Sequence, residues 1–308
     1  MKNGKARLFA LWPKLRLPVY LFLAVLSFSS IEVLANPIRH RIDPFALTFW
    51  RFFIATACLF PITVLRKKFH FSTIRPREWL ALFLLGCLNV ILCMGAHALS
   101  IKHASASTAA LLIASNPLAT SLFAWLILKE RYDLRRGLLM GVGLLGVAMV
   151  ALRPSAGVDT PMGISAGIVG MVGFALYTVL SKGLVQRLGS LTATTLSFLL
   201  ALVVYFPLLI ALKIPLFPAP DVWPHLLALG VVVSGFGYIA FFKALKDLPA
   251  GRASLLFFFK PPVSLFLAWL FLGESPTLFA GIGSALIMAG IFFDRKVPAS
   301  TRVAPQTG

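Results

Sequence analysis

Apolar stretches of 16 to 24 residues, separated by short polar segments, make up nearly the whole chain. A helix that crosses a bilayer needs about 20 mostly apolar residues. Backbone groups in hydrocarbon must hydrogen-bond internally, and these stretches lack the polar–apolar alternation of barrel strands, so the pattern predicts helices. The ten predicted spans are Leu17–Asn36, Phe45–Leu65, Trp79–Ser100, Ser105–Leu128, Leu134–Leu152, Met162–Ser181, Leu191–Leu212, Trp223–Leu245, Ala253–Leu272 and Leu278–Phe293.

The composition excludes a soluble protein. Of the 308 residues, 59% are hydrophobic and 13% are charged, and the mean hydropathy is +0.89. Soluble domains contain about 45–50% apolar and about 25% charged residues, because charges must cover their exterior. The three cysteines lie inside apolar stretches and predict buried side chains rather than a disulfide framework. We therefore expect an all-α polytopic membrane protein with ten transmembrane helices.

The net charge of +19 is distributed in a way that predicts the orientation of the chain. With the N-terminus inside, 22 of the 29 lysines and arginines fall in the inner connections and tails, and five fall in the outer connections. Cytoplasmic loops carry such an excess. Both ends are therefore predicted to be cytoplasmic, with residues 1–16 as an N-terminal segment and residues 294–308 as a disordered tail. The basic residues do not gather on one face, which argues against a nucleic-acid partner.

The first span also has features of a secretory signal peptide. Basic residues precede it, and Val33-Leu34-Ala35 resembles a small-residue cleavage site. However, Glu32 lies directly before that site, and nine further spans follow. The segment is therefore interpreted as a retained transmembrane helix.

The chain contains an internal repeat. Residues 104–130 and 248–274 align at a shift of 144 residues, and the match extends over tryptophan, proline and glutamate in one register. The predicted repeats, residues 17–152 and 162–293, contain five spans each, so the second must be inverted relative to the first. Inverted repeats are typical of transporters whose halves rock about a site near the midplane. The matched pairs include Ala106/Ala250, Pro117/Pro261, Trp125/Trp269 and Glu130/Glu274.

Several motifs resemble those of the EamA-type permeases, the ten-helix members of the drug/metabolite transporter superfamily. The resemblance covers nearly the whole chain. It implies a solute permease of a cell inner membrane, often an exporter of amino acids or other small metabolites. The matching pieces are Pro44 with Trp50-Arg51-Phe52, ALSIKHASASTAALLIASNPL across spans three and four, Phe174-Ala175-Leu176-Tyr177, Tyr238 through Ala244-Leu245, Leu248-Pro249-Ala250, Ser254, Pro261 and Leu272-Gly273-Glu274.

Two matched positions predict a polar cavity at mid-depth. Lys260 and Asn116 are repeat counterparts, and each precedes proline, in Lys260-Pro261-Pro262 and Asn116-Pro117. Proline breaks intrahelical hydrogen bonds, and broken helices at matched places in two repeats indicate a binding site. Lys260 would then favour a substrate with a carboxylate or phosphate. The alternative is a kink for packing, with Lys260 extending toward the inner face.

Other polar residues in the spans are weaker candidates. Glu32 and Arg51 lie at similar depth on consecutive helices, which allows an ion pair or a coupling role for Glu32. Tyr177 and Tyr238 are candidates for lining the substrate pathway, although tyrosine packing is an equal alternative. His97, near the outer end of span three, is more typical of an interfacial histidine.

The sequence lacks the signatures of common enzyme chemistry. Gly163-Ile164-Ser165-Ala166-Gly167 fits the nucleophile-elbow pattern, but it opens an apolar helix without acid and histidine partners. Metal-binding and nucleotide-binding motifs are also missing, so no catalytic residue, metal or cofactor is predicted. The leading hypothesis is a carrier for a small molecule, working by alternating access in the lipid bilayer. The alternative is a non-transporting membrane protein, such as an intramembrane enzyme or lipid-binding scaffold. Small-xxx-small glycine spacings also allow a homodimer.

Overall fold

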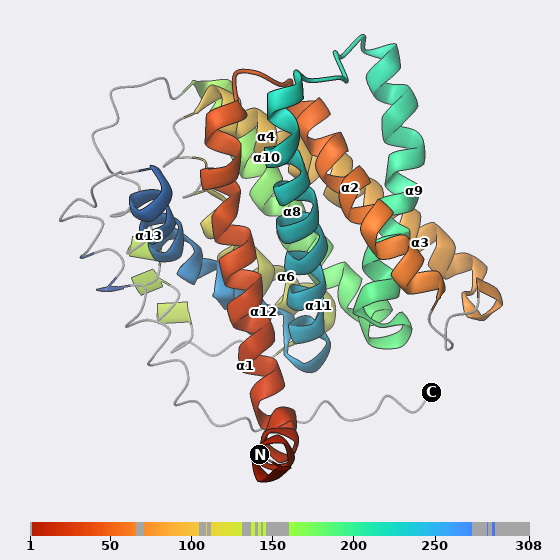
Figure 1. The fold of residues 1–308 in the computed structure, drawn as a ribbon, viewed down its shortest axis with the longest axis vertical. Helices are drawn as coiled ribbons and strands as arrows, with labels where there is room; N and C mark the ends of the chain where they lie inside the picture. Colours follow the sequence, from red (N-terminus) through yellow and green to blue (C-terminus); the bar gives the residue numbers. More distant parts are fainter. Residues whose placement is uncertain are drawn as a thin grey trace.

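The computed structural model describes residues 2–65, 71–104, 109, 112–130, 137, 138, 141, 142, 144, 145, 160–272, 282, 285 and 286. These residues form helices joined by turns and short loops, and they include no strand (Figure 1). The helices of the first repeat are α1 (Lys2–Ala35), η1 (Asn36–Ile38), α2 (Pro44–Val64), η2 (Phe71–Thr73), α3 (Pro76–Gly86), η3 (Cys87–Cys93), α4 (Met94–His103) and α6 (Asn116–Leu128). Those of the second are α8 (Pro161–Leu188), α9 (Ser190–Ala211), η4 (Pro220–Val222), α10 (Trp223–Ala228), η5 (Leu229–Gly237), α11 (Tyr238–Asp247), α12 (Ala250–Ser254), η6 (Leu255–Phe259) and α13 (Lys260–Leu272).

The all-helical class predicted from the sequence is confirmed. Seven of the described helices are long and apolar enough to cross a membrane. An eighth apolar helix, Leu112–Leu128, lies in the predicted span Ser105–Leu128. The predicted spans Leu134–Leu152 and Leu278–Phe293 lie mostly outside the described residues, so the count of ten stays a prediction.

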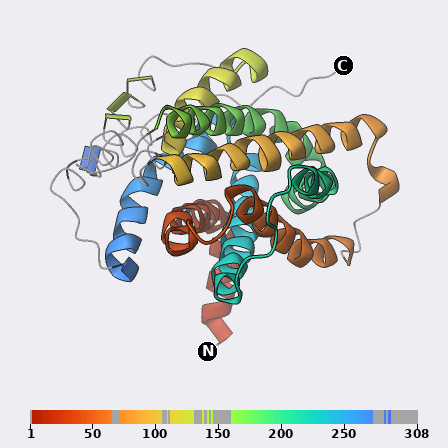
Figure 2. The same ribbon diagram turned by 90° about the horizontal axis from the view of Figure 1, so that it is seen from above.

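The contacts between the two repeats come in equivalent pairs, as the inverted symmetry requires. Helix α1 of the first repeat contacts η5, α11 and α13 of the second repeat. Its equivalent in the second repeat, α8, contacts η3, α4 and α6 of the first repeat. The contact of α2 with η5 is matched by that of α9 with η3, and the contact of α2 with α9 joins equivalent helices. The contact of α6 with α12 joins the two broken spans, four and nine. Figure 2, seen from above, shows α1 beside the teal and blue helices of the second repeat and α8 beside the orange helices of the first. The space between the repeats is therefore lined by equivalent helices.

Two helices approach each other closely where a glycine leaves room. A Cβ atom at Gly86 of α3 would collide with the backbone carbonyl of Ser197 in α9. Glycine is required here because the neighbouring atom is backbone and cannot turn away. By contrast, Gly183 of α8 has open space where its Cβ would be.

Gly86→Ala is expected to lower the free energy of unfolding by about 1–3 kcal/mol, the usual cost of forcing extra volume into a packed contact. The matched control is Gly183→Ala, which should be neutral or slightly stabilising, because alanine favours a helix over glycine by up to about 1 kcal/mol. Thermal unfolding of the detergent-solubilised proteins measures both effects. Equal melting temperatures for the two variants would contradict a close α3–α9 contact.

Candidate functional site

Helices are interrupted at the same place in each repeat. In the first, a turn at Ser115 comes before α6, which begins with Asn116-Pro117. In the second, α12 passes into the 3₁₀ segment η6 before α13 begins with Lys260-Pro261-Pro262. The prolines occupy the first turn of each new helix, where their missing N–H has no intrahelical partner to lose. Asn116 and Lys260 are thus each the first residue of the second half of a broken helix.

A second matched irregularity lies in the neighbouring helix of each repeat. The π-helical segments η3 and η5 end at Cys93 and Gly237, which are separated by the repeat shift of 144 residues. Segments of π-helix are rare and occur often at functional sites. The sequence analysis did not predict them, because their residues are as apolar as those of the regular helices beside them. Together, the breaks and the π-helical segments give each repeat two irregular helices.

Two cationic residues and an imidazole are buried inside the helical bundle. Arg51 on α2 and His97 on α4 are each 2% exposed, and Lys260 on α13 is 3% exposed. His97 lies within electrostatic reach of both Lys260 and Arg51. Neither ring nitrogen of His97 has a hydrogen-bond partner among the described residues. Burying charged or unpaired polar groups in an apolar environment is costly, so these three residues are the candidates for a binding site.

Ser29 of α1 holds Lys260 in position through the backbone. Its hydroxyl donates to the carbonyl oxygen of Lys260 at 3.3 Å, and its own carbonyl accepts from the Ser264 hydroxyl at 2.8 Å. Both bonds join α1 of the first repeat to the irregular part of span nine. They supply partners for backbone and hydroxyl groups next to the helix break, where water cannot reach from the lipid side.

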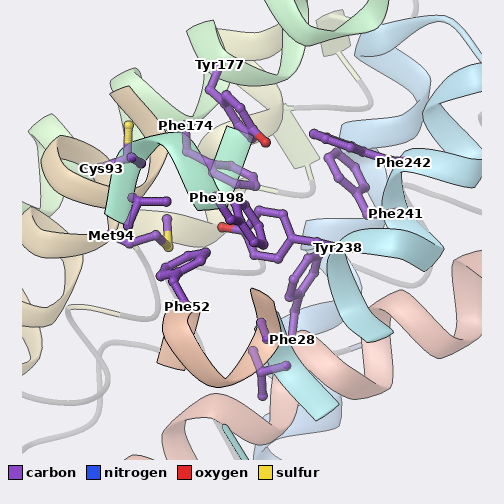
Figure 3. Packing of buried hydrophobic residues seen from close by; sticks show 14 of the residues in the cluster. Phe28, Phe52, Cys93, Met94, Phe174, Tyr177, Phe198, Tyr238, Phe241 and Phe242 are labelled. Carbon is purple, nitrogen blue, oxygen red and sulfur yellow. The ribbon is translucent and has the colours of Figure 1, made fainter. Parts of the chain in front are cut away.

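Tyr238 connects this cationic region to an aromatic cluster (Figure 3). Its hydroxyl donates to Asn89 Oδ1 of η3 at 3.2 Å, and Arg51 lies within electrostatic reach of it. Its ring makes edge contacts with Phe28, Phe52 and others, with centroid distances of 5.4 Å to Phe28 and 5.8 Å to Phe52. The Tyr238–Asn89 bond joins the two π-helical regions, one from each repeat. The rings that surround Tyr238 are Phe28, Phe52, Phe174, Phe198 and Phe242.

Asn116 is buried but does not direct its amide toward Lys260. Its Nδ2 donates to the carbonyl of Met171 on α8 at 3.3 Å, and its Oδ1 accepts from the Thr120 hydroxyl at 2.8 Å. The amide thus fastens α6 to α8 in this conformation. A role for Asn116 in binding substrate stays a prediction.

The other predicted residues have different outcomes. Tyr177 is buried on α8 beside the aromatic cluster, with its ring 5.6 Å from that of Phe242. Glu32 lies on α1, but its side chain is outside the described set, so its pairing with Arg51 or its coupling role stays a prediction. Sequence reasoning did not single out Asn89, which is fully buried and whose Nδ2 has no partner in the described part of the chain. An asparagine in an apolar span was itself a usable signal, because such a group is costly in lipid.

The repeats are fastened together at the end of the bundle where α1 begins, called here the N-terminal end. Glu130, after α6 of the first repeat, accepts three hydrogen bonds from the second. Its donors are Lys182 Nζ at 2.8 Å, the backbone N–H of Ala250 at 2.9 Å and that of Gly251 at 3.4 Å. A carboxylate at a helix start is stabilised by the exposed N–H groups and the helix dipole. Glu130 therefore binds the beginning of the helix that carries Lys260.

Two further contacts between the repeats lie at the same end. Arg187, near the end of α8, forms an ion pair with Glu78 and donates to the carbonyl of Thr73 at 2.9 Å. The Lys243 ammonium lies 4.6 Å from the ring centroid of Tyr20 on α1. The predicted span six ended at Ser181, but α8 continues to Leu188. This extra length is what brings Lys182 and Arg187 to their partners.

The fold and site define a multi-pass helical membrane protein built from two repeats around buried polar residues. The sequence profile described as the EamA-like transporter family matches residues 17–152 and 161–293, so two copies cover most of the chain. The protein belongs to the EamA-like transporter family. The resemblance stated from the sequence motifs is confirmed.

Similar proteins agree with this assignment. An uncharacterized transporter of Clostridium kluyveri is 28% identical, covering 88% of this chain and 90% of its own. The uncharacterized transporter YyaM of Bacillus subtilis is 25% identical, covering 81% and 83%. A probable terminal-alkyne amino-acid exporter of Streptantibioticus cattleyicolor is 29% identical, covering 67% and 70%. A solved structure described as "Crystal structure of protein" has a TM-score of 0.75 at 21% identity, covering 88% of this chain and 93% of its own, and shows the same fold.

Glu130→Gln is expected to lower the free energy of unfolding by about 2 kcal/mol, because hydrogen bonds to a charged group contribute about 1.5–3 kcal/mol. The Glu130 and Lys182 side chains are only 16% and 14% exposed, so water replaces little of the loss. Asp221→Asn is the matched control, since its pair with Arg41 is about half exposed and such pairs contribute about 0–1 kcal/mol. Thermal unfolding in detergent compares the two. A smaller shift for Glu130→Gln than for Asp221→Asn would contradict the assigned role of Glu130.

Proposed function

We propose that this transporter exports a small metabolite, an amino acid or a related carboxylate, by alternating access around a cavity between the repeats. The observation that carries the proposal is the burial of Lys260, Arg51 and His97 near one another inside the bundle. A cationic site inside a membrane suits an anionic group of the solute, because opposite charges attract strongly in a medium of low dielectric constant. Arg51 and His97 come from the first repeat and Lys260 from the second. A solute bound among them would contact both moving halves.

Amino acids are favoured as the solute class by one relative. The protein of Streptantibioticus cattleyicolor described as a probable terminal-alkyne amino-acid exporter is 29% identical over 210 residues. Its described substrate carries a carboxylate, which is the group that Lys260 and Arg51 would bind. The export direction proposed here rests on the same relative and on the family resemblance. The hydrogen-bonding groups of Asn89 and Tyr238 would orient the remainder of the solute.

The proposed motion is a rocking of one repeat against the other. The contacts of Glu130 with Lys182, Ala250 and Gly251 close the N-terminal end in this conformation. Opening that end requires these contacts to separate. The interrupted helices supply bending points, because the backbone at Ser115 and in η6 departs from regular α-helix. We infer that solute binding at Lys260 and release of Glu130 are linked through span nine, which carries Lys260 and begins at the partners of Glu130.

We also propose that the protein resides in the cell inner membrane with both termini in the cytoplasm. The positive-inside rule supports this orientation, since 22 of 29 lysines and arginines fall on the side of the termini. In this orientation the N-terminal end of the bundle faces the cytoplasm. A homodimer through the small-xxx-small glycine faces remains a proposal of the same kind. The non-transporting alternative is not favoured for a member of a transporter family.

Lys260→Met is expected to reduce export of the solute by at least about tenfold, because losing a buried charged partner costs about 2 kcal/mol or more and 1.4 kcal/mol corresponds to a factor of ten. Untargeted metabolite profiling of cells and medium identifies the solute by comparing the parent protein with an empty vector. Lys246→Met is the matched control, since it removes an exposed lysine from α11. Unchanged export by a folded Lys260→Met protein would remove Lys260 from the site. If no metabolite moves with the parent protein, the export proposal fails.

Reporter fusions test the orientation. Green fluorescent protein fused to the C-terminus should fluoresce, because it folds on the cytoplasmic side, and alkaline phosphatase fused after Lys213 should be active, because that connection is predicted to lie outside. Alkaline phosphatase fused after Lys246 serves as the control and should be inactive. The reverse pattern would contradict cytoplasmic termini.

A further inference from the structure

A group of hydroxyls lies buried between α8 and α9, apart from the cationic region. Tyr177 and Ser181 belong to α8, and Thr194 and Ser197 belong to α9. Their exposures are 1%, 3%, 0% and 3%. Within the described residues, Tyr177 Oη, Ser181 Oγ and Thr194 Oγ1 have no hydrogen-bond partner, whereas Ser197 Oγ donates to the Thr194 carbonyl at 3.0 Å. We call these four residues the hydroxyl cluster.

The helical spacing directs the four hydroxyls toward one another. Tyr177 and Ser181 are four residues apart on α8, and Thr194 and Ser197 are three apart on α9, so each pair shares one helix face. The hydroxyls of Ser181 and Ser197 lie close enough to the phenol of Tyr177 to interact with it, although Tyr177 Oη has no hydrogen bond of good geometry among the described residues. Ser197 of α9 therefore lies on the side of that helix that meets Tyr177 and Ser181 of α8.

Neighbouring hydroxyls in the same helices behave differently. Thr178 Oγ1 donates to the Phe174 carbonyl at 2.9 Å, and Thr63 Oγ1 donates to Thr195 Oγ1 at 3.0 Å. Buried hydroxyls in proteins are nearly always paired, with protein or with ordered water. Hydroxyls without a partner on these two neighbouring helices fit bound water, because such water needs two to four polar partners.

The hydroxyl cluster lies between the cationic region and the N-terminal end. Ser181 is seven residues, about 10 Å along a helix, from the end of α8 at Leu188, and Thr194 is about 6 Å from the start of α9 at Ser190. Tyr177 is within electrostatic reach of Tyr238. Tyr238 in turn binds Asn89 and lies near Arg51. Buried polar groups thus continue from the cationic region toward this end.

We propose that the hydroxyl cluster binds water and forms the cytoplasmic half of the solute pathway. We call this water-binding part of the pathway the station. The inference rests on the proposed function, and it assigns the path on one side of Lys260 to α8 and α9 rather than to the broken helix of Asn116. Water held by Tyr177, Ser181 and Thr194 keeps the solute's polar groups hydrogen-bonded as they move between the cytoplasm and the cationic region. The station carries no cation of its own, so it does not compete with Lys260 for an anionic group.

Cysteine accessibility tests the station without knowledge of the solute. In a background with Cys58, Cys87 and Cys93 replaced by alanine, Ser181→Cys and Thr194→Cys are exposed in inside-out membranes to a sulfonate-bearing methanethiosulfonate. This impermeant reagent reacts with thiolates, which form in water and not in apolar packing. We expect both cysteines to be modified several-fold faster than the matched control Thr178→Cys. Equal, slow modification of all three would overturn the proposal.

Isosteric substitutions separate a transport role from a structural one. Thr194→Val removes an unpaired hydroxyl, and Thr195→Val removes a paired one from the adjacent position. If the cluster were only an imperfection of packing, Thr194→Val would raise the melting temperature and leave transport unchanged, because losing an unpaired buried hydroxyl favours folding. The proposal predicts a several-fold slower export of the metabolite identified by profiling, without a lower melting temperature. Thr195→Val should lower the melting temperature instead.

The two tests also separate failure of the station from failure of the proposed function. Labelled Ser181→Cys together with unchanged export in Thr194→Val would mean that the region is hydrated but is not on the solute path, which overturns the station. If no metabolite is exported by the parent protein, the labelling result alone decides whether the hydrated region exists. Slow labelling with normal, Lys260-dependent export would leave the proposed function intact and reject the station.

Discussion

A helix that is interrupted inside a membrane exposes carbonyl and N–H groups that hydrocarbon cannot bind. The rest of this structure depends on that constraint. The break at Ser115 lies on a helix that packs against α8 and α12, and η6 lies against α1, α6 and α12. The irregular backbone is thus covered by the opposite repeat as well as its own. A site built on broken helices can exist only between the repeats, which is also where motion between them would be felt.

The inverted repeat gives equivalent positions but not equivalent chemistry. Lys260 and Asn116 both begin the second half of a broken helix. Asn116 uses its amide to hold α6 on α8, while Lys260 lies near His97 among the buried cations. The duplicated backbone therefore supplies two similar bends, but the side chains at the bends differ, since Lys260 is cationic and Asn116 is a neutral amide. Such asymmetry suits a carrier that must bind one solute at its centre rather than two.

Much of the fold could be predicted from the sequence, because the length of each apolar stretch and the positions of the charged residues can be read directly along the chain. The mid-depth position of Lys260 and the prolines behind each break were visible in the same way. The partners were not, because contacts such as Tyr238–Asn89 join residues 149 positions apart. The π-helical segments also escaped prediction, since their residues do not differ from regular apolar helix. For Glu130, the repeat match to Glu274 was visible, but its three donors depend on how the halves pack.

In the proposed cycle, closure of the N-terminal end and binding of the solute both act on the same helix. Span nine begins with the N–H groups of Ala250 and Gly251, which Glu130 binds, and reaches Lys260 ten residues later. Between them lies η6, whose 3₁₀ geometry is poorer than that of an α-helix and costs less to change. If the start of this helix moves away from Glu130, the displacement would therefore either change the geometry of η6 or be passed on to Lys260. Because the Ser29 hydroxyl joins the carbonyl of Lys260 to α1, a shift that passes through η6 when the N-terminal end opens would be felt at Lys260 and at α1 together.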